Sequence, residues 1–204
     1  MTLHRRTFTA ALLGAAILPA GFAMAQVDVA ALHAPSPIGE MALGPETAKV
    51  TVVEYASASC PHCAEFYKTA FQTLKKDYID TGKIRFIFRE FPHNQAALAA
   101  FMIARCAPQD KYFPMVDMMF EQQENWLKSP RDGLFTIAQM AGFTKESFEA
   151  CLKDEAVAKG IISVRDKAET FGVKGIPTFF VNGELVTGEP TIENLRGKID
   201  PLLK

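Results

Sequence analysis

The chain has 204 residues, of which 49% are hydrophobic and 22% charged, and its formal net charge is -1. This is the composition of a globular protein, so it excludes a largely disordered chain and argues against nucleic acid as a partner. The length suffices for one domain with a full core, or for one small fold that carries a sizeable insertion.

Residues 1–25 have the pattern of a secretory signal peptide. Arg5 and Arg6 precede an apolar run over residues 10–18, and small residues follow up to Ala25. The run is too short to remain as a bilayer anchor, although a membrane-tethered protein is the alternative. The paired arginines also fit a twin-arginine signal, which a receptor reads. We expect cleavage near Ala25 and export to a compartment where disulfides form and persist.

The next segments predict the first half of an α/β fold. Residues 26–45 are rich in proline and glycine without a period, which indicates an extended leader. Residues 50–55 are β-branched or aromatic and predict a buried strand. Apolar side chains then recur at helical spacing from Pro61 until Gly82, and residues 83–91 alternate as a second strand. A strand, helix and strand in this order form a parallel unit with a right-handed crossover.

Residues 93–172 predict an all-helical domain inserted into the α/β domain formed by residues 46–92 and 173–204. The helical pattern is broken at Pro108, Ser129, Pro130, Gly142 and Asp154. Strand patterns return at residues 178–181 and 184–187, joined by Asn182-Gly183, a strong hairpin turn. Thr191 is then the expected N-cap of a last helix.

The motif Cys60-Pro61-His62-Cys63 lies after a strand and opens a helix. Unpaired N–H groups and the helix dipole stabilise a thiolate at Cys60, and Pro61 suits the first helical turn. Cys60 is therefore expected to be the nucleophile and Cys63 the resolving thiol, with His62 as a further donor to the Cys60 thiolate. The alternatives are an exposed turn residue for His62 and a zinc half-site for the cysteines, although no second cysteine pair has ligand spacing.

Ile176 and Pro177 come directly before the strand at residues 178–181. A proline there could simply mark the start of an edge strand. Together with the cysteine motif, however, it resembles the cis-proline loop that lies against the active-site sulfurs in thioredoxin-fold proteins. In that case the backbone of Ile176 is free to pair with an extended substrate.

These features together resemble the DsbA-like disulfide oxidases: residues 53–55 ahead of the cysteine motif, a long helical insertion, and residues 175–183. The resemblance implies a thioredoxin fold with an inserted all-helical domain and a periplasmic dithiol oxidase. It further implies that reduced, unfolded exported proteins are the substrates and that a membrane quinone-linked, DsbB-like partner restores the disulfide. We expect a monomer without a cofactor or metal.

Glu54 lies six residues before Cys60 and matches the position of a buried acid in that family. A carboxyl group there could relay the proton of Cys63. The alternative is a side chain that faces solvent or pairs with a base such as Arg89.

Cys106 and Cys151 are additional to the motif and both lie in the helical insertion. We interpret them as a structural disulfide, with two buried free thiols as the alternative. Five side chains between these cysteines form either a flexible substrate surface or, as we favour, part of the core: Phe113, Met115, Met118, Met119 and Phe120. His33 and His93 carry no pattern, so a surface position is the default for both.

Three functions compete at this stage. The first is the oxidase, and the second is an isomerase or reductase of the same fold, because Ile176 also resembles reducing thioredoxins. Such isomerases usually carry a dimerisation module, for which residues 26–45 are too short. The third is a copper(I)-binding protein that uses Cys60 and Cys63 as soft ligands, but the motif lacks accompanying Met or His clusters.

Overall fold

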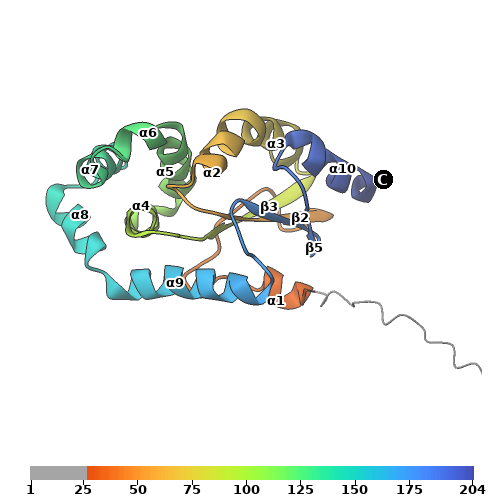
Figure 1. Cartoon of the computed structure of the whole chain (residues 1–204), viewed down its shortest axis with the longest axis horizontal. Helices are drawn as coiled ribbons and strands as arrows, with labels where there is room; N and C mark the ends of the chain where they lie inside the picture. Colours follow the sequence, from red (N-terminus) through yellow and green to blue (C-terminus); the bar gives the residue numbers. More distant parts are fainter. Residues whose placement is uncertain (1–26) are drawn as a thin grey trace, which may run out of the picture.

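The computed structural model describes residues 27–204. The expected signal peptide and its cleavage near Ala25 lie outside the described residues. A central sheet separates two helical layers, and further helices extend from one side of it (Figure 1). No helix within residues 27–204 has both the length and the apolar character needed to cross a membrane.

The sheet has five strands in the order β1-β3-β2-β4-β5. Their bounds are β1 Ala42–Leu43, β2 Val50–Ala56, β3 Ile84–Glu90, β4 Thr178–Val181 and β5 Glu184–Leu185. β2 and β3 are parallel, and the other neighbouring strands are antiparallel. The parallel pair confirms the expected strand, helix and strand unit, and the hairpin between β4 and β5 turns at Asn182 and Gly183, both with positive φ. β5 is shorter than the predicted strand.

The helices account for most of the remaining chain. They are α1 Val29–His33, α2 Pro61–Phe66, α3 Gln72–Leu74, α4 Gln95–Cys106, α5 Gln109–Glu121, α6 Gln123–Trp126, α7 Pro130–Met140, α8 Lys145–Leu152, α9 Glu155–Thr170 and α10 Ile192–Leu203. Two π-helical turns, η1 Tyr67–Phe71 and η2 Lys75–Ile79, continue α2 and α3 into one helical segment. The segment begins at Pro61 and stops before Gly82, as the apolar spacing predicts.

The two faces of the sheet are covered by different helices (Figure 1). α9 and α1 cover one face, where Val53 and Tyr55 of β2 pack with Phe171. The opposite face carries the larger core, which includes Val52 and residues of α2, α4, α5 and α10. Successive strand residues point to opposite faces, so Glu54 lies on the same side as Val52.

The helical residues between β3 and β4 form α4 to α9, and the predicted breaks all fall between these helices or at their first residues. Met115, Met119 and Phe120 are buried in the core, and Phe113 and Met118 pack against it. These residues therefore pack as we favoured, rather than forming an exposed surface. The exact limits of a separate helical domain stay a prediction.

The segment expected to be an extended leader is not extended throughout. α1 and β1 both fall within it, and β1 pairs with β3 at the edge of the sheet. α1 spans five residues and starts at the N-cap Asp28, so it is too short to show a helical period. Buried Arg89 holds this segment, donating to Glu40 Oε1 at 2.8 Å and to the Ala34 carbonyl at 3.0 Å.

A second arginine ties the same segment to the helices. The side chain of Arg105 in α4 is 3% exposed and pairs with fully buried Glu90, with 2.9 Å between Nη2 and Oε2. The Tyr112 hydroxyl also donates to Glu90 at 2.7 Å. Arg105 Nη1 donates to the carbonyls of Ile38 and Gly39. These bonds satisfy a buried charge pair that would otherwise destabilise the fold.

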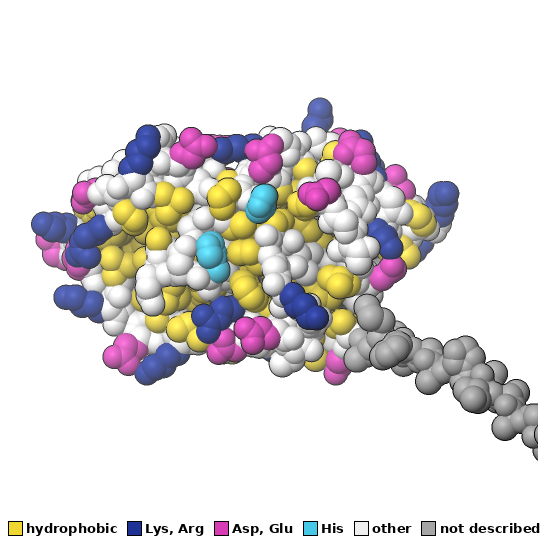
Figure 2. Space-filling view, viewed as in Figure 1, with side chains coloured by type: hydrophobic (Ala, Val, Ile, Leu, Met, Phe, Trp, Pro, Cys, Tyr) yellow, Lys and Arg dark blue, Asp and Glu magenta, His cyan; other side chains and the backbone are white. Residues whose placement is uncertain are grey.

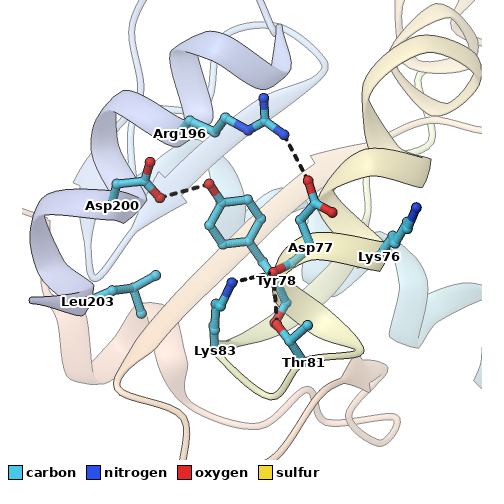
Figure 3. A pocket seen from close by; sticks show the side chains of 8 residues that line it. All are labelled: Lys76, Asp77, Tyr78, Thr81, Lys83, Arg196, Asp200 and Leu203. Carbon is cyan, nitrogen blue, oxygen red and sulfur yellow. Dashed lines mark hydrogen bonds and ion pairs between the residues drawn. The ribbon is translucent and has the colours of Figure 1, made fainter.

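The C-terminal helix is tied to the helical segment that follows the cysteine motif (Figure 3). The Tyr78 hydroxyl donates to Asp200 at 2.7 Å, and Arg196 pairs with Asp77 at 2.8 Å. Figure 3 shows these side chains pointing toward one another across an open pocket. Because these polar groups pair with each other, the pocket is a structural junction between η2 and α10.

Cys106 at the end of α4 and Cys151 in α8 form a disulfide across 45 residues of sequence. We expect the Cys106→Ala/Cys151→Ala double variant to lower the free energy of unfolding by about 4 kcal/mol, because a cross-link restricts the unfolded chain. Denaturant unfolding measures this change. The reactivity of Cys60 should be the same in folded molecules of the variant and of the unaltered protein. A lower Cys60 reactivity in the folded variant would contradict a purely structural role for the disulfide.

Candidate active site

The two motif cysteines lie at the start of α2, at the edge of the sheet where β2 ends. Cys60 is the N-cap of α2, and Pro61 occupies its first turn. Both cysteines are free thiols here; Cys60 is 7% exposed and Cys63 is completely buried. The sulfur that a second protein can reach is therefore the Cys60 sulfur.

The two thiols differ strongly in proton affinity. Hydrogen bonding from the Cys63 thiol, together with the backbone N–H groups of Cys63 and His62, lowers the pKa of Cys60 to about 5, against the opposing effect of burial. Burial is the largest cause that raises the pKa of Cys63, and the hydrogen bond to Cys60 adds to it. At neutral pH the dithiol thus carries one thiolate, at Cys60, and one thiol, at Cys63.

His62 is exposed, and its backbone N–H is the part that stabilises the Cys60 thiolate. The predicted role of its imidazole stays a prediction. The histidine charge that lowers the Cys60 pKa belongs instead to His93. His93 Nδ1 lies 2.8 Å from Ser57 Oγ, and the Ser57 carbonyl accepts from the Cys60 N–H at 3.0 Å.

His93 is at the surface, as the default assumed, but the sequence analysis did not associate it with the site. The strand order could have assigned His93 to the site, because the carboxyl ends of neighbouring parallel strands meet at one edge of a sheet. His93 follows β3 as Cys60 follows β2, so both loops converge there. His33, the other histidine with a surface default, is the last residue of α1 and is half-buried, and burial is the first cause that lowers its pKa.

A buried glutamine fixes the loop that carries Cys60. Gln123 is 4% exposed and donates from Nε2 to the carbonyl of Ala58 at 2.8 Å and to that of Cys60 at 3.0 Å. Nothing in the sequence pattern distinguishes Gln123 from a surface residue of the helical region. Its contact is made across 63 residues of sequence and emerges only from the packing of α6 against the motif.

The Ile176–Pro177 peptide bond is cis, and this loop faces the motif. The Ile176 carbonyl lies 3.7 Å from Cys60 Sγ. A groove runs beside the motif between α2 and the loop before α10, and its lining includes His62, Phe66, Ile176, Pro177 and Pro190. In Figure 2, hydrophobic side chains gather around two histidines on one face of the molecule, with charged side chains mainly toward its rim.

Glu54 lies in the middle of β2 between Phe88 of β3 and Phe179 of β4. It is completely buried, and neither carboxylate oxygen has a hydrogen-bond partner among the described residues. The alternative of an exposed or Arg89-paired side chain is wrong, because Arg89 pairs with Glu40. Burial raises the pKa of Glu54 well above its ordinary value, and its charge in turn raises the pKa of Cys63. The raised pKa favours the protonated, neutral form of the Glu54 carboxyl group.

Within residues 27–204, no group of three or more His, Cys, Asp and Glu side chains is arranged to hold a metal ion. Cys106 and Cys151 lie in the helical region, bonded to each other and apart from the motif. The structure therefore brings together Glu54, Pro61 and His62 with the two motif cysteines, and with the loop at Ile176 and Pro177.

A family model described as thioredoxin matches residues 36–201. This match spans most of the chain, so the chain belongs to the thioredoxin family. Within that family its structure is similar to DsbA proteins. The crystal structure of Wolbachia pipientis alpha-DsbA1 superposes with a TM-score of 0.77 at 29% identity and covers 84% of this chain and 94% of the Wolbachia chain.

The sequence is similar to a Rickettsia bellii protein named "Putative protein-disulfide oxidoreductase", with 37% identity over 171 residues. That alignment covers 81% of this chain and 65% of the Rickettsia protein. A Bacillus anthracis protein named "Probable disulfide bond formation protein D" is 27% identical over 173 residues, which are 81% of this chain and 79% of that protein. The chain spans 60% to 65% of the length of five matching Rickettsia proteins.

We expect His93→Gln to move the midpoint of the Cys60 thiolate titration upward by roughly half a pH unit, since an exposed charge contributes about 0.2–1 kcal/mol. Glutamine retains a polar partner for Ser57 and removes only the charge. Thiolate absorbance against pH gives the midpoint, and His33→Gln serves as the control. An unchanged midpoint in His93→Gln would exclude an electrostatic role for His93.

Glu54 should make stability depend on pH. Because its folded-state pKa is raised, the folded protein keeps a proton that the unfolded chain loses above about pH 4.3, so stability falls as pH rises from there. Glu54→Leu should therefore raise the free energy of unfolding at pH 7 by roughly 1–3 kcal/mol. Denaturant unfolding at several pH values should show this gain shrinking toward pH 4. A gain that is independent of pH would contradict the titration of Glu54.

Proposed function

We propose that this protein is a thiol-disulfide oxidase that passes a Cys60–Cys63 disulfide to reduced cysteines of unfolded, exported proteins. The observation that carries the proposal is the difference between the two thiols: the pKa of Cys60, which is 7% exposed, is lowered to about 5, and the pKa of completely buried Cys63 is raised. A thiolate of low pKa is a good leaving group, and its stability favours the reduced form of the enzyme. The disulfide form is correspondingly oxidising.

The exchange proceeds in two steps. A client thiolate first attacks Cys60 Sγ, the Cys60–Cys63 bond breaks, and the electron pair leaves with Cys63 Sγ. In this proposal protonated Glu54 supplies the proton that makes Cys63 a thiol, which its complete burial and its electrostatic effect on Cys63 support. A second client thiolate then attacks the client sulfur of the mixed disulfide, and Cys60 leaves as the stabilised thiolate. The client gains a disulfide, and the enzyme ends with the thiolate and thiol found here.

The groove beside the motif supports binding of an extended client segment. The Ile176 carbonyl is directed at Cys60 Sγ at 3.7 Å, so it can accept from the backbone of a chain that crosses the motif. Apolar side chains along the groove, among them Phe66 and Pro190, suit the hydrophobic segments that unfolded proteins expose. In this proposal Ile176 and Pro177 bind substrate, and Pro61 and His62 shape the motif.

The remaining parts of the proposal rest on the resemblance to DsbA proteins. They are export to the periplasm after removal of residues 1–25, action as a monomer, and reoxidation of the Cys60–Cys63 pair by a membrane quinone-linked, DsbB-like protein. An isomerase or reductase of the same fold would use the same two thiols, and only the equilibrium between dithiol and disulfide separates these activities.

The test is the equilibrium of the Cys60–Cys63 pair with glutathione, measured in the Cys106→Ala/Cys151→Ala variant so that one pair titrates. We expect a potential more oxidising than the glutathione poise, and a reduced form that resists denaturant better than the oxidised form. Cys63→Ser is first treated with oxidised glutathione, so that Cys60 carries a glutathione mixed disulfide. A thiolate of a reduced, unfolded model protein should then attack Cys60 Sγ, release glutathione and accumulate as a mixed disulfide, whereas Cys60→Ser should form none. A potential well below the glutathione poise would show a reductant or isomerase.

A further inference from the structure

Three side chains of the larger core each bury a polar atom that has no hydrogen-bond partner among the described residues. They are Glu54 with both carboxylate oxygens, Tyr67 with its hydroxyl and Asp117 with Oδ1. Nearly all buried polar atoms of folded proteins are paired, because an unpaired one destabilises the fold. Three such groups within one core require an explanation that packing does not supply.

The hydroxyl of Tyr67 is the clearest case. Tyr67 is 3% exposed, and its ring stacks between Phe71 at 4.3 Å and Phe120 at 4.1 Å, with the edge of Phe88 beside it. A phenylalanine would make the same ring contacts without burying a hydroxyl. The surroundings therefore account for the aromatic ring but not for its oxygen.

Tyr67 is linked to the resolving cysteine through its own helix and to the helix of Asp117 through a ring contact. It lies four residues after Cys63 and its N–H donates to the Cys63 carbonyl, so the two side chains share one face of the helix. Phe120, which stacks on the Tyr67 ring, lies three residues after Asp117 on the same face of α5. Burial is the largest cause that raises the pKa of Tyr67. The charges of nearby groups raise it further, in decreasing order those of Glu54, Asp117, Tyr112 and Cys63.

Asp117 connects this interior to the surface. It is half-buried and lines a pocket between α5 and β1, together with Lys75, Asp110 and Glu40. Burial and the charge of Glu121 raise the pKa of Asp117 to about 6, against the opposing effect of Lys75. A carboxyl group of this kind exchanges protons with water near neutral pH. The pocket shares no lining residue with the groove beside the motif.

We propose that the Tyr67 hydroxyl carries protons between Glu54 and Asp117, so that the proton that Cys63 gains or loses travels through the core to the pocket beside α5. This deepens the proposed function by adding Tyr67 and Asp117 to its proton transfer. Buried water can bridge polar atoms that are spaced too far apart for direct hydrogen bonds, since two to four polar partners hold such a water. The route stays open while a client covers the groove.

The proton count is balanced in both directions. When Cys63 leaves the disulfide as a thiolate, Glu54 gives it a proton; Tyr67 passes its hydroxyl proton to Glu54 and accepts one from Asp117, which takes one from water. When Cys63 attacks a mixed disulfide at Cys60, the same transfers run in reverse. Tyr67 remains a neutral phenol before and after each transfer, which agrees with the raised pKa that burial imposes on it.

The experiment isolates the step in which Cys63 loses its proton. A mixed disulfide of Cys60 with glutathione is prepared on the full chain, and the release of glutathione by Cys63 is followed by rapid mixing across pH and in heavy water. We expect Tyr67→Phe to slow release at pH 7 on the order of tenfold, a part of what general acid-base catalysis contributes. The deficit should vanish at high pH, where hydroxide removes the proton directly.

Asp117→Asn should slow release in the same way, and Tyr78→Phe is the matched control. Tyr78 bonds to Asp200 at the junction with α10, so the loss of its hydroxyl should leave the release rate unchanged. The free energy of unfolding should be equal or higher in Tyr67→Phe, because the buried hydroxyl is removed. The unfolding measurement therefore distinguishes a Tyr67 hydroxyl that carries protons from one that stabilises the packing.

Two results would overturn the inference. One is a Tyr67→Phe release rate and pH profile equal to those of the unaltered protein. The other is slower release at every pH together with a loss of stability, which would identify the hydroxyl as structural. Glutathione release depends only on attack by Cys63, so this test is read independently of the redox potential. A reducing potential would therefore refute the proposed oxidase without deciding the role of Tyr67.

Discussion

Parallel pairing of β2 with β3 is the constraint on which the site depends. It brings the loops after both strands to one edge of the sheet, where Cys60 begins α2 and His93 follows β3. The same pairing places Glu54 opposite Phe88 in the middle of the sheet, away from water. The pairing of these two strands therefore fixes two features of the site. The N-terminus of α2, which stabilises a thiolate at Cys60, lies at the edge of the sheet, and Glu54, whose burial favours the neutral acid, lies in its interior.

In the two proposals, disulfide exchange takes place at the Cys60 sulfur and proton transfer takes place among the buried side chains behind it. Cys60 retains some solvent exposure, whereas Cys63, Glu54 and Tyr67 are buried. In the proposed function, completely buried Cys63 therefore takes its proton from Glu54 rather than from water in the groove. The stacked rings around Tyr67 hold its hydroxyl in one position, which is what a directed proton transfer requires.

Local patterns predicted most of the fold and the reactive cysteines. The cysteine motif, the hairpin turn at Asn182 and the breaks between helices each depend on near neighbours in sequence, so single-chain reasoning reaches them. Gln123 and His93 depend on contacts across 63 and 36 residues, for which no local pattern exists. The burial of Glu54 was undecided for the same reason, since one charged residue in an apolar strand fits either face until the neighbouring strands are known.

The two outer strands of the sheet have a consequence for a protein that handles unfolded chains. β1 and β5 are each two residues long, so neither offers a ladder on which an extended polypeptide could build further strands. A long exposed edge strand would promote aggregation with the unfolded client proteins that the proposed activity binds. Because both outer strands are short, the proposed function relies on the Ile176 carbonyl beside Cys60, rather than on a sheet edge, for backbone pairing with a client.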